Sequence, residues 1–338
     1  MNNKKNPTIK DIARLANVST TTVSHVLNNT RRVSDKLSDR VQTVIREIDY
    51  KPNAMARALR VHSSKTLGLI IPDNSNPFFS EIALGAEDCA FRHGYSLFLC
   101  NSRHDSARES TYMTTLSTYA VDGLILSAVS DDLNQLSEFV KSGIPLVVVD
   151  RKLPVPDVEF IYSDHIEGAR EATQHLVELG HRRIGIITGP TDVRPALDRI
   201  QGFEEVLNEH GIPIDPDLCI LGDFQVESGR RAARKMMELS DPPTAVFACN
   251  DMMAIGALQT LRTLGFKVPE DVSLVGFDDI FLASLLDPPL TTVAQSAYAI
   301  GEMAVASLIK RIDGSNKLVP QDQSLPTDLI IRKSTRRL

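Results

Sequence analysis

The sequence lacks long apolar runs and closely spaced cysteines. No stretch of its 338 residues approaches the ~18–20 apolar residues of a membrane-spanning helix. The four cysteines are scattered and form no CxxC pair, which argues against a disulfide framework and a metal site. The first seven residues are polar without an apolar core, so we expect no secretory signal and a cytoplasmic protein with free thiols.

Signatures of catalysis are also missing. The sequence contains no GxSxG, HExxH, Walker A or GxGxxG motif. The adjacent carboxylates Asp278 and Asp279 could suggest acid–base chemistry, but no nucleophile–base motif stands beside them. We therefore expect no enzyme, no cofactor and no metal. No leucine heptad follows Ile331, so we expect a homodimer without a tetramerising coiled coil.

Length and charge indicate a small head on a larger body. At ~150 residues per domain, 338 residues correspond to about two domains. Residues 1–65 hold 13 lysines and arginines against 5 acidic residues, a net charge of +8, whereas the whole chain carries −6. The body therefore carries −14. This asymmetry indicates that only the head contacts a polyanion such as DNA; a basic tail that merely aids solubility is the alternative.

Three short helices are predicted in the head. Thr8 followed by Asp11 is typical of a capping box, and apolar residues follow at helical spacing. Ser19 can cap a second helix over 20–27, and Ser34 can cap a third. A helix, a tight turn and a second helix of this size are typical of a helix-turn-helix. The outward face of the second helix carries short polar side chains that can reach base edges. These are Thr20, Thr21, Ser24 and His25, and Arg31 joins the expected DNA contacts.

A fourth helix is expected to form only when it is bound to a partner. Pro52 ends the third helix, and Asn53 can cap about two further turns, too short to be stable alone in water. Leu59, flanked by Arg57 and Arg60, is interpreted as an apolar wedge between base steps in the minor groove. The alternative is that Leu59 packs on its own domain.

The head resembles a known family. Residues 9–13, 18–28 and 50–57 are similar to the signature of LacI/GalR-family transcriptional regulators, and residues 19–25 are most similar to the recognition segment of that family's ribose and purine repressors. The resemblance continues to the C-terminus. It implies that Thr20, Thr21 and His25 face bases in the major groove. It also implies that Leu59 inserts at the operator centre, where two hinge helices meet.

The body alternates β-rich apolar runs with amphipathic helices, which predicts an α/β fold of parallel sheets covered on both faces. We expect strands over 67–71, 96–100, 123–127, 146–149, 184–188, 245–248 and 273–276. We expect helices over 79–93, 110–119, 167–179, 202–210, 228–239, 252–264 and 300–312. The body is too long for one such sheet, so two lobes are expected.

The resemblance implies a periplasmic-binding-protein-like body whose chain crosses three times between the lobes. The expected parts are a helix-turn-helix head over 1–52, a hinge helix and linker over 53–65, an N-terminal lobe over 66–163 plus 294–323, and a C-terminal lobe over 164–293 plus 324–338.

Aromatic, carboxylate, guanidinium and amide side chains follow the expected strands, where ligands bind in such folds. A monosaccharide needs this mixture, because its C–H faces pack on rings and each hydroxyl both donates and accepts. The resemblance implies a ribose-contacting set. It consists of Asn76, Phe78, Phe79, Asp150, Arg151, Arg199, Phe224, Asn250, Asp278 and Gln295.

Several members of this set have plainer readings. Phe79 could be core, Asn250 and Asp278 could cap helices, and Arg151 could form an ion pair between lobes. The purine repressor pattern has an arginine and a threonine where Val193 and Pro195 stand, which argues against a purine effector.

Together these features predict a dimeric repressor that binds operator DNA and is released by a monosaccharide inducer such as ribose. A purine-responsive repressor, a catabolite-control regulator with a phosphoprotein partner, a transporter's sugar-binding protein and a sugar enzyme are the alternatives. The basic head argues against the transporter protein, and the missing catalytic motifs argue against the enzyme.

Overall fold

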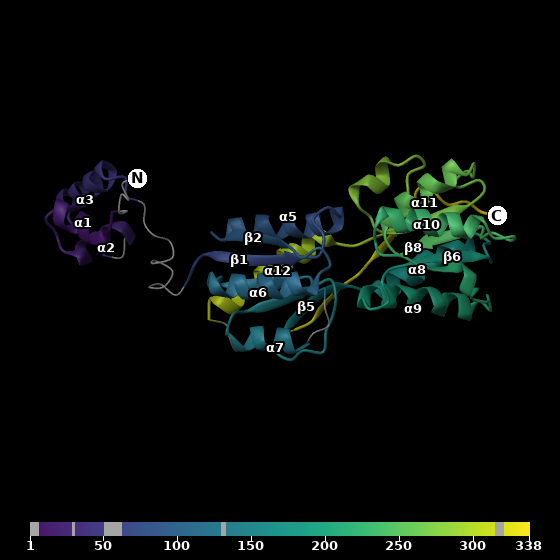
Figure 1. Ribbon diagram of the computed structural model, residues 1–338, viewed down its shortest axis with the longest axis horizontal. Helices are drawn as coiled ribbons and strands as arrows, with labels where there is room; N and C mark the ends of the chain where they lie inside the picture. Colours follow the sequence, from purple (N-terminus) through teal and green to yellow (C-terminus); the bar gives the residue numbers. More distant parts are fainter. Residues whose placement is uncertain (1–6, 29–30, 51–62, 130–132, 315–320) are drawn as a thin grey trace. The chain divides into compact units, whose positions relative to one another are not determined.

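The computed structural model divides into two compact units, Met1–Ser64 and Lys65–Leu338, which are described separately (Figure 1). The residues that it describes are 7–28, 31–50, 63–129, 133–314 and 321–338. The expected hinge helix lies outside these residues, and so do Asn53, Arg57, Leu59 and Arg60.

The first unit contains three helices, α1 (Ile9–Leu15), α2 (Thr20–Asn28) and α3 (Asp35–Glu47). They pack around one small apolar core, as the helical spacing predicts. Its buried members are Ile12, Ala13, Ala16, Val23, Val41 and Val44.

Two of the three expected helix caps are formed. The Thr8 amide donates to the Asp11 carboxylate at 2.9 Å, and the Asp11 amide donates to Thr8 Oγ1 at 3.4 Å, which completes the capping box. Ser19 Oγ accepts from the Thr22 amide at 3.0 Å. Ser34 stands at the N-cap of α3, but its side chain makes no capping hydrogen bond; this helix end is exposed, so water can satisfy its amides.

The second unit begins with an N-terminal lobe built on a parallel six-stranded sheet in the order β11-β5-β4-β3-β1-β2. Its strands are β1 (Thr66–Ile71), β2 (Ser96–Asn101), β3 (Gly123–Leu126), β4 (Leu146–Val149), β5 (Glu159–Ser163) and β11 (Gln323–Leu325). Helices cover both faces, with one apolar core under the first two and another under the last two. They are α5 (Pro77–Arg92), α12 (Ala297–Ile312), α6 (Ser106–Thr118) and α7 (Leu133–Lys141).

The C-terminal lobe has a second six-stranded sheet in the order β12-β10-β9-β8-β6-β7, in which β12 alone runs antiparallel to its neighbour. Its strands are β6 (Ile184–Thr188), β7 (Cys219–Leu221), β8 (Ala245–Ala248), β9 (Ser273–Asp278), β10 (Thr291–Ala294) and β12 (Asp328–Ile330). Its helices are α8 (His165–Glu178), α9 (Arg194–Glu209), α10 (Val226–Met237) and α11 (Asp251–Thr263). The short 3₁₀ helices η1 (Pro216–Leu218) and η2 (Phe281–Leu285) complete it.

Three segments join the two lobes, between β5 and α8, between β10 and α12, and between β11 and β12 (Figure 1). Two of the expected boundaries need correction. Ala294 still pairs with Asp278 in the C-terminal sheet, and Ser324 and Leu325 still pair with β5 in the N-terminal sheet. The second and third crossings therefore lie one to two residues later than predicted, because pairing with a distant strand decides these ends.

Candidate functional site

The candidate DNA-binding face lies on α2. Thr20 and Thr21 are exposed in its first turn, and Ser24 and His25 are half-buried one turn further on. The spacing i, i+1, i+4 and i+5 places all four on one stripe, opposite the buried Val23. Arg31 is exposed beyond the end of α2. The described part of the expected DNA-contacting set is therefore available to a duplex.

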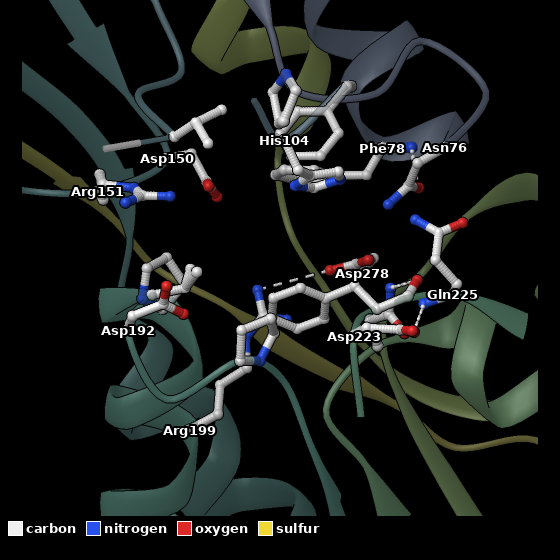
Figure 2. Close-up of a pocket in the computed structure, with 18 residues that line it drawn as sticks. Asn76, Phe78, His104, Asp150, Arg151, Asp192, Arg199, Asp223, Gln225 and Asp278 are labelled. Atoms are coloured by element: carbon white, nitrogen blue, oxygen red, sulfur yellow. Dashed lines mark hydrogen bonds and ion pairs between the residues drawn. The ribbon is translucent and has the colours of Figure 1, made fainter. Parts of the chain in front are cut away.

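The candidate ligand site is a cavity of about 370 Å³ between the two lobes (Figure 2). The N-terminal lobe contributes Pro72, Asn76, Phe78, Phe79, His104, Val129, Asp150 and Arg151. The C-terminal lobe contributes Pro190, Asp192, Val193, Pro195, Arg199, Asp223, Phe224, Gln225, Asn250 and Asp278. Nine of the ten residues expected to bind the ligand line this one cavity.

The cavity lies at the carboxyl ends of the parallel strands, as this class of fold predicts. Pro72 follows β1, Asp150 follows β4, and Asn250 comes two residues after β8. Asp278 is the last residue of β9. Polar side chains from both lobes therefore face one space, although they come from segments far apart in the sequence.

Gln295 is the exception in the expected set. Its Nε2 donates to Asp278 Oδ1 at 2.7 Å, and it is not among the residues that line the cavity. The side chain is buried, and its bond holds the carboxylate of Asp278, which does line the cavity. A role of Gln295 in effector binding therefore stays a prediction, and its described contact is with Asp278.

Arg199 is held on several sides. It projects from α9, is 4% exposed, and stacks its guanidinium over the Phe277 ring at 3.9 Å. One Nη donates to the Cys249 carbonyl, and the other lies 3.6 Å from Asp278 Oδ1. These contacts fix the direction of the guanidinium, and the described residues offer its buried Nε no partner.

Two carboxylates in the cavity are hard to ionise. Burial raises the pKa of Asp278 to about 7, although the nearby Arg199 opposes the rise. Burial also raises the pKa of Asp150, against the attraction of Arg151 and Arg199. Hydroxyl groups of a ligand could donate to these carboxylates and restore the hydrogen bonds that water otherwise supplies.

Phe224 forms an aromatic wall of the cavity. Its φ of +64° lies in the left-handed region, and Asn250 Nδ2 donates to its carbonyl at 3.0 Å. Gly189 makes room for the ring, since a Cβ there would lie 2.1 Å from Phe224 Cζ. Asn250 also caps α11 by accepting from the Met253 amide at 2.9 Å. The plainer reading of Asn250 as a cap is thus correct, and the residue still faces the cavity.

Of the other alternative interpretations, the one for Phe79 is confirmed and the one for Asp278 is wrong. Phe79 packs in the apolar core under α5 and also lines the cavity. Asp278 ends a strand, with a φ of +114°, and it bonds to Gln295 instead of capping a helix. Nine lining residues are outside the expected set, and among them His104 and Gln225 are polar side chains that the sequence reasoning did not name. His104 sits on a left-handed turn after β2, and neither residue carries a motif that sequence reasoning could use.

Two further findings concern the described part of the chain. No group of three or more histidine, cysteine, aspartate or glutamate side chains there could hold a metal ion. None of its helices combines the length and the apolar character needed to cross a membrane.

Comparison with known proteins gives a match for each of the two units. Residues 8–53 match the family model for bacterial regulatory proteins of the lacI family, and residues 173–335 match the periplasmic binding protein-like domain. The HTH-type transcriptional repressor PurR of Haemophilus influenzae (strain PittEE) is 39% identical over 336 residues, covering 98% of this chain and 99% of that protein. PurR of Aliivibrio salmonicida (strain LFI1238) is 38% identical, with 98% and 99% covered.

Several solved structures of transcriptional regulators are also similar to this chain. The lac repressor dimer bound to operator and the anti-inducer ONPF is 30% identical with a TM-score of 0.85, over 98% of this chain and 100% of that chain. A LacI family transcriptional regulator from Enterococcus faecium with bound ribose is 31% identical with a TM-score of 0.74, over 81% and 99%. A complex of the regulator CelR with cellobiose is 34% identical with a TM-score of 0.74, over 97% and 99%.

Proposed function

The chain belongs to the lacI family of bacterial regulatory proteins and is a DNA-binding transcriptional repressor with an effector-binding body, and we propose that its effector is a monosaccharide, D-ribose in the first instance. The supporting observation is the cavity, where acceptors and donors come from both lobes. Asp150 and Arg151 stand on one side, and Arg199 and Asp278 stand on the other. Each pair can accept from and donate to a sugar hydroxyl.

The aromatic side chains suit a pyranose or furanose ring. Phe78 and Phe79 pack edge to face with ring centroids 5.1 Å apart on the N-terminal lobe, and Phe224 lies on the C-terminal lobe. A sugar's C–H faces can pack on such rings while its hydroxyls contact the carboxylates and guanidinium groups. A cavity of about 370 Å³ lies near the lower end of the ~300–1,000 Å³ typical of small-molecule sites.

A purine effector is the second candidate, because the similar relatives from Haemophilus influenzae and Aliivibrio salmonicida are repressors named PurR. Val193 and Pro195 argue the other way. Both line the cavity, and neither side chain can donate a hydrogen bond to the acceptor atoms of a purine base. A base in this cavity would have to find its side-chain donors elsewhere in the lining, which offers the amides of Asn76, Gln225 and Asn250, the His104 ring and the guanidinium groups of Arg151 and Arg199.

We expect the sugar to act as an inducer. Bound between the lobes, it favours one lobe arrangement over the other by its differential affinity, which weakens operator binding. Isothermal titration calorimetry with D-ribose and hypoxanthine identifies the effector class. An operator gel shift with each compound gives the sign. Tighter operator binding with ribose would make it a corepressor, and binding of hypoxanthine alone would replace the sugar by a purine.

The DNA-binding residues Thr20, Thr21, Ser24, His25 and Arg31 are proposed to contact the operator from α2. Outside the described residues, Asn53, Arg57, Leu59 and Arg60 are proposed to form the hinge helix and its wedge. Leu59→Ala should weaken operator binding much more than non-specific binding, because only the operator centre is pried open by the wedge. Equal losses on both DNAs would contradict the wedge.

A homodimer is proposed, with two heads reading half-sites about one helical turn apart. Large apolar side chains on the body are exposed in the single chain and suit burial against a second copy. They include Phe91 (76% exposed), Phe98 (49%), Leu221 (64%) and Leu285 (72%). Sedimentation equilibrium should give twice the chain mass, and Phe91→Glu should shift it toward the monomer. We expect this dimer to act in the cytoplasm, where operator DNA is found.

A further inference from the structure

His165 lies at the first crossing between the lobes. It is the first residue of α8, directly after Asp164, whose side chain caps the helix by accepting from the Glu167 amide at 3.1 Å. The imidazole is 3% exposed. It is not among the residues that line the cavity, yet it contacts two that are, Asp150 and Arg199.

The two ring nitrogens of His165 have opposite roles. Nε2 lies 2.9 Å from the Asp150 carbonyl oxygen, and Nδ1 lies 3.4 Å from Arg199 Nη2. A carbonyl can only accept and a guanidinium can only donate, so Nε2 carries the hydrogen and Nδ1 the lone pair. Burial lowers the pKa of His165 to about 3, and the positive charges of Arg199 and Arg151 act in the same direction. The imidazole is therefore neutral and in one tautomer.

The two partners of the ring belong to different lobes. The Asp150 amide donates to the Ile161 carbonyl of β5 at 2.9 Å, which ties it to the N-terminal sheet. Its φ of +74° is a left-handed conformation that a non-glycine residue keeps only when its surroundings hold it. Arg199 belongs to α9 of the C-terminal lobe.

His165 is carried with the C-terminal lobe. Helix α8 approaches α9 closely at Gly202, where a Cβ would lie 2.3 Å from the Ile166 carbonyl oxygen. Gly202 is three residues from Arg199, and Ile166 follows His165, so the ring and the guanidinium share one rigid support. A rotation of the lobes must then change the bond between His165 and the Asp150 carbonyl.

We infer that His165 is a positioning residue that couples occupation of the cavity to the angle between the lobes, because one imidazole holds the Asp150 turn of the first lobe and the Arg199 guanidinium of the second. The inference rests on the proposed effector pocket. An effector that contacts the Asp150 and Arg199 side chains favours the lobe arrangement in which both bonds of the ring are made. The ring is thus the element through which occupation changes the lobe equilibrium.

Two substitutions test the coupling in the full-length protein. His165→Phe keeps a flat ring and removes both nitrogens, whereas His165→Gln keeps one donor and one acceptor. The readout is the ratio of operator affinities without and with saturating D-ribose. Allosteric ratios are typically about 5–150-fold, and we expect His165→Phe to bring this one below about twofold. Its ribose affinity should stay within tenfold of wild type, and its ribose-free operator affinity within about twofold, since neither contact requires the ring directly.

We expect His165→Gln to restore part of the ratio, which a merely space-filling ring would not allow. His175→Phe is the matched control on the same helix, because His175 bonds to Thr335 and not to the cavity residues; its ratio should equal that of wild type. A wild-type ratio in His165→Phe would overturn the inference. So would a loss of thermal stability and ribose-free operator binding that His165→Gln does not repair.

A second measurement separates this inference from the proposed effector. Nitrogen-15 NMR of histidine-labelled protein should show His165 as a neutral Nε2–H imidazole from pH 5 to pH 8. A ring protonated in this range, or carrying its hydrogen on Nδ1, overturns the inference whatever the effector is. If neither D-ribose nor hypoxanthine changes operator binding by the wild-type protein, the proposed effector class fails, while this spectrum still decides the state of His165.

Discussion

Gln225 Nε2, on the C-terminal lobe, donates a hydrogen bond to Asp73 Oδ2 of the N-terminal lobe at 3.3 Å. Asp73 also accepts from the amide and hydroxyl of Ser75, so its carboxylate is held in place. Gln225 lines the cavity, and its backbone N–H donates to Asp223 Oδ1 at 3.0 Å. The bond therefore joins the lobes across the cavity from two fixed supports.

Gln225→Ala should speed effector release. The bond to a carboxylate is worth ~1.5–3 kcal/mol at most and less when half-exposed, so we expect the D-ribose dissociation rate to rise about three- to tenfold. Gln225→Glu should raise it further, because it places a carboxylate opposite Asp73. Stopped-flow dissociation measures both rates.

The matched control is Gln201→Ala, since Gln201 is exposed on α9 and bonds to Glu205 away from the cavity. A double-mutant cycle with Asp73→Ala distinguishes an effect of the Gln225–Asp73 bond from direct contact between Gln225 and the sugar. Additive effects of the two substitutions would show that the bond between the lobes does not hold the sugar in place.

Effector affinity should depend on the ionisation of Asp278. Its pKa near 7 means that the free protein holds a proton there below about pH 7, whereas a sugar hydroxyl donates to the ionised carboxylate. D-ribose affinity should therefore rise between pH 6 and pH 8, with release of a proton on binding below pH 7. Calorimetry in two buffers of different ionisation enthalpy counts that proton. Asp278→Asn should flatten the profile, and Asp287→Asn, at an exposed position outside the cavity, should leave it unchanged.

The same carboxyl group determines in which direction the stability of the ligand-free protein changes with pH. Its folded pKa is raised above the ordinary 3.8 of an aspartate, so between about pH 4 and pH 7 the folded state retains a proton that the unfolded state has lost. The contribution of Asp278 to the free energy of unfolding is greatest below this window and falls as the pH rises through it. In urea titrations, Asp278→Asn should lose that part of the decline; an unchanged slope would contradict the assignment.

Gly189→Ala should damage the cavity through Phe224. The added Cβ would lie 2.1 Å from the Phe224 ring, so the ring must move into the space that the effector occupies. We expect D-ribose affinity to fall at least about fivefold and stability to fall by ~1–3 kcal/mol from overpacking. Gly211→Ala is the control, because its φ of +63° is strained but no atom lies within 4 Å of the added Cβ. It should cost stability and leave affinity unchanged; equal affinity losses would contradict the role of Phe224.

The operator-reading face can be tested residue by residue. Thr21→Ala and His25→Ala should each weaken operator binding by ~1–3 kcal/mol and leave non-specific binding nearly unchanged, as expected for base contacts. Gln42→Ala, an exposed change on α3, should alter neither. Gel shifts on operator and scrambled DNA give both affinities. Parallel losses on the two DNAs would make these side chains backbone contacts instead.

The sequence is informative where local chemistry decides the structure. The capping box at Thr8, the cap at Ser19 and the apolar spacing of the head act within one helical turn, so they could be predicted. Strands with continuous apolar runs, such as β4 and β8, were found for the same reason.

Elements that depend on distant partners could not be predicted. The strand β5 carries Glu159, a buried charge that looks out of place until Arg311, Ser307 and Gln323 surround its carboxylate. The three-residue strands β11 and β12, the short exposed β7 and the helix α7 carry too little local signal.

In the site, too, some residues could be predicted from the local sequence and others depend on distant partners. Strand ends mark Asp150, Asn250 and Asp278, because the topology of a parallel sheet places such ends at one edge. His165 and Gln225 gain their roles from atoms supplied by other elements, at Asp150, Arg199 and Asp73. No spacing along the chain contains that information.

The three crossings have a consequence for biosynthesis. The apolar core beneath α5 includes Ile300, Ala304, Val305 and Leu308 of α12, and the sheet edge beyond β5 is completed by β11. A ribosome translates these segments after nearly all of the C-terminal lobe. The nascent N-terminal lobe must wait with an open apolar face until then, so it cannot complete its fold before most of the C-terminal lobe has been synthesised.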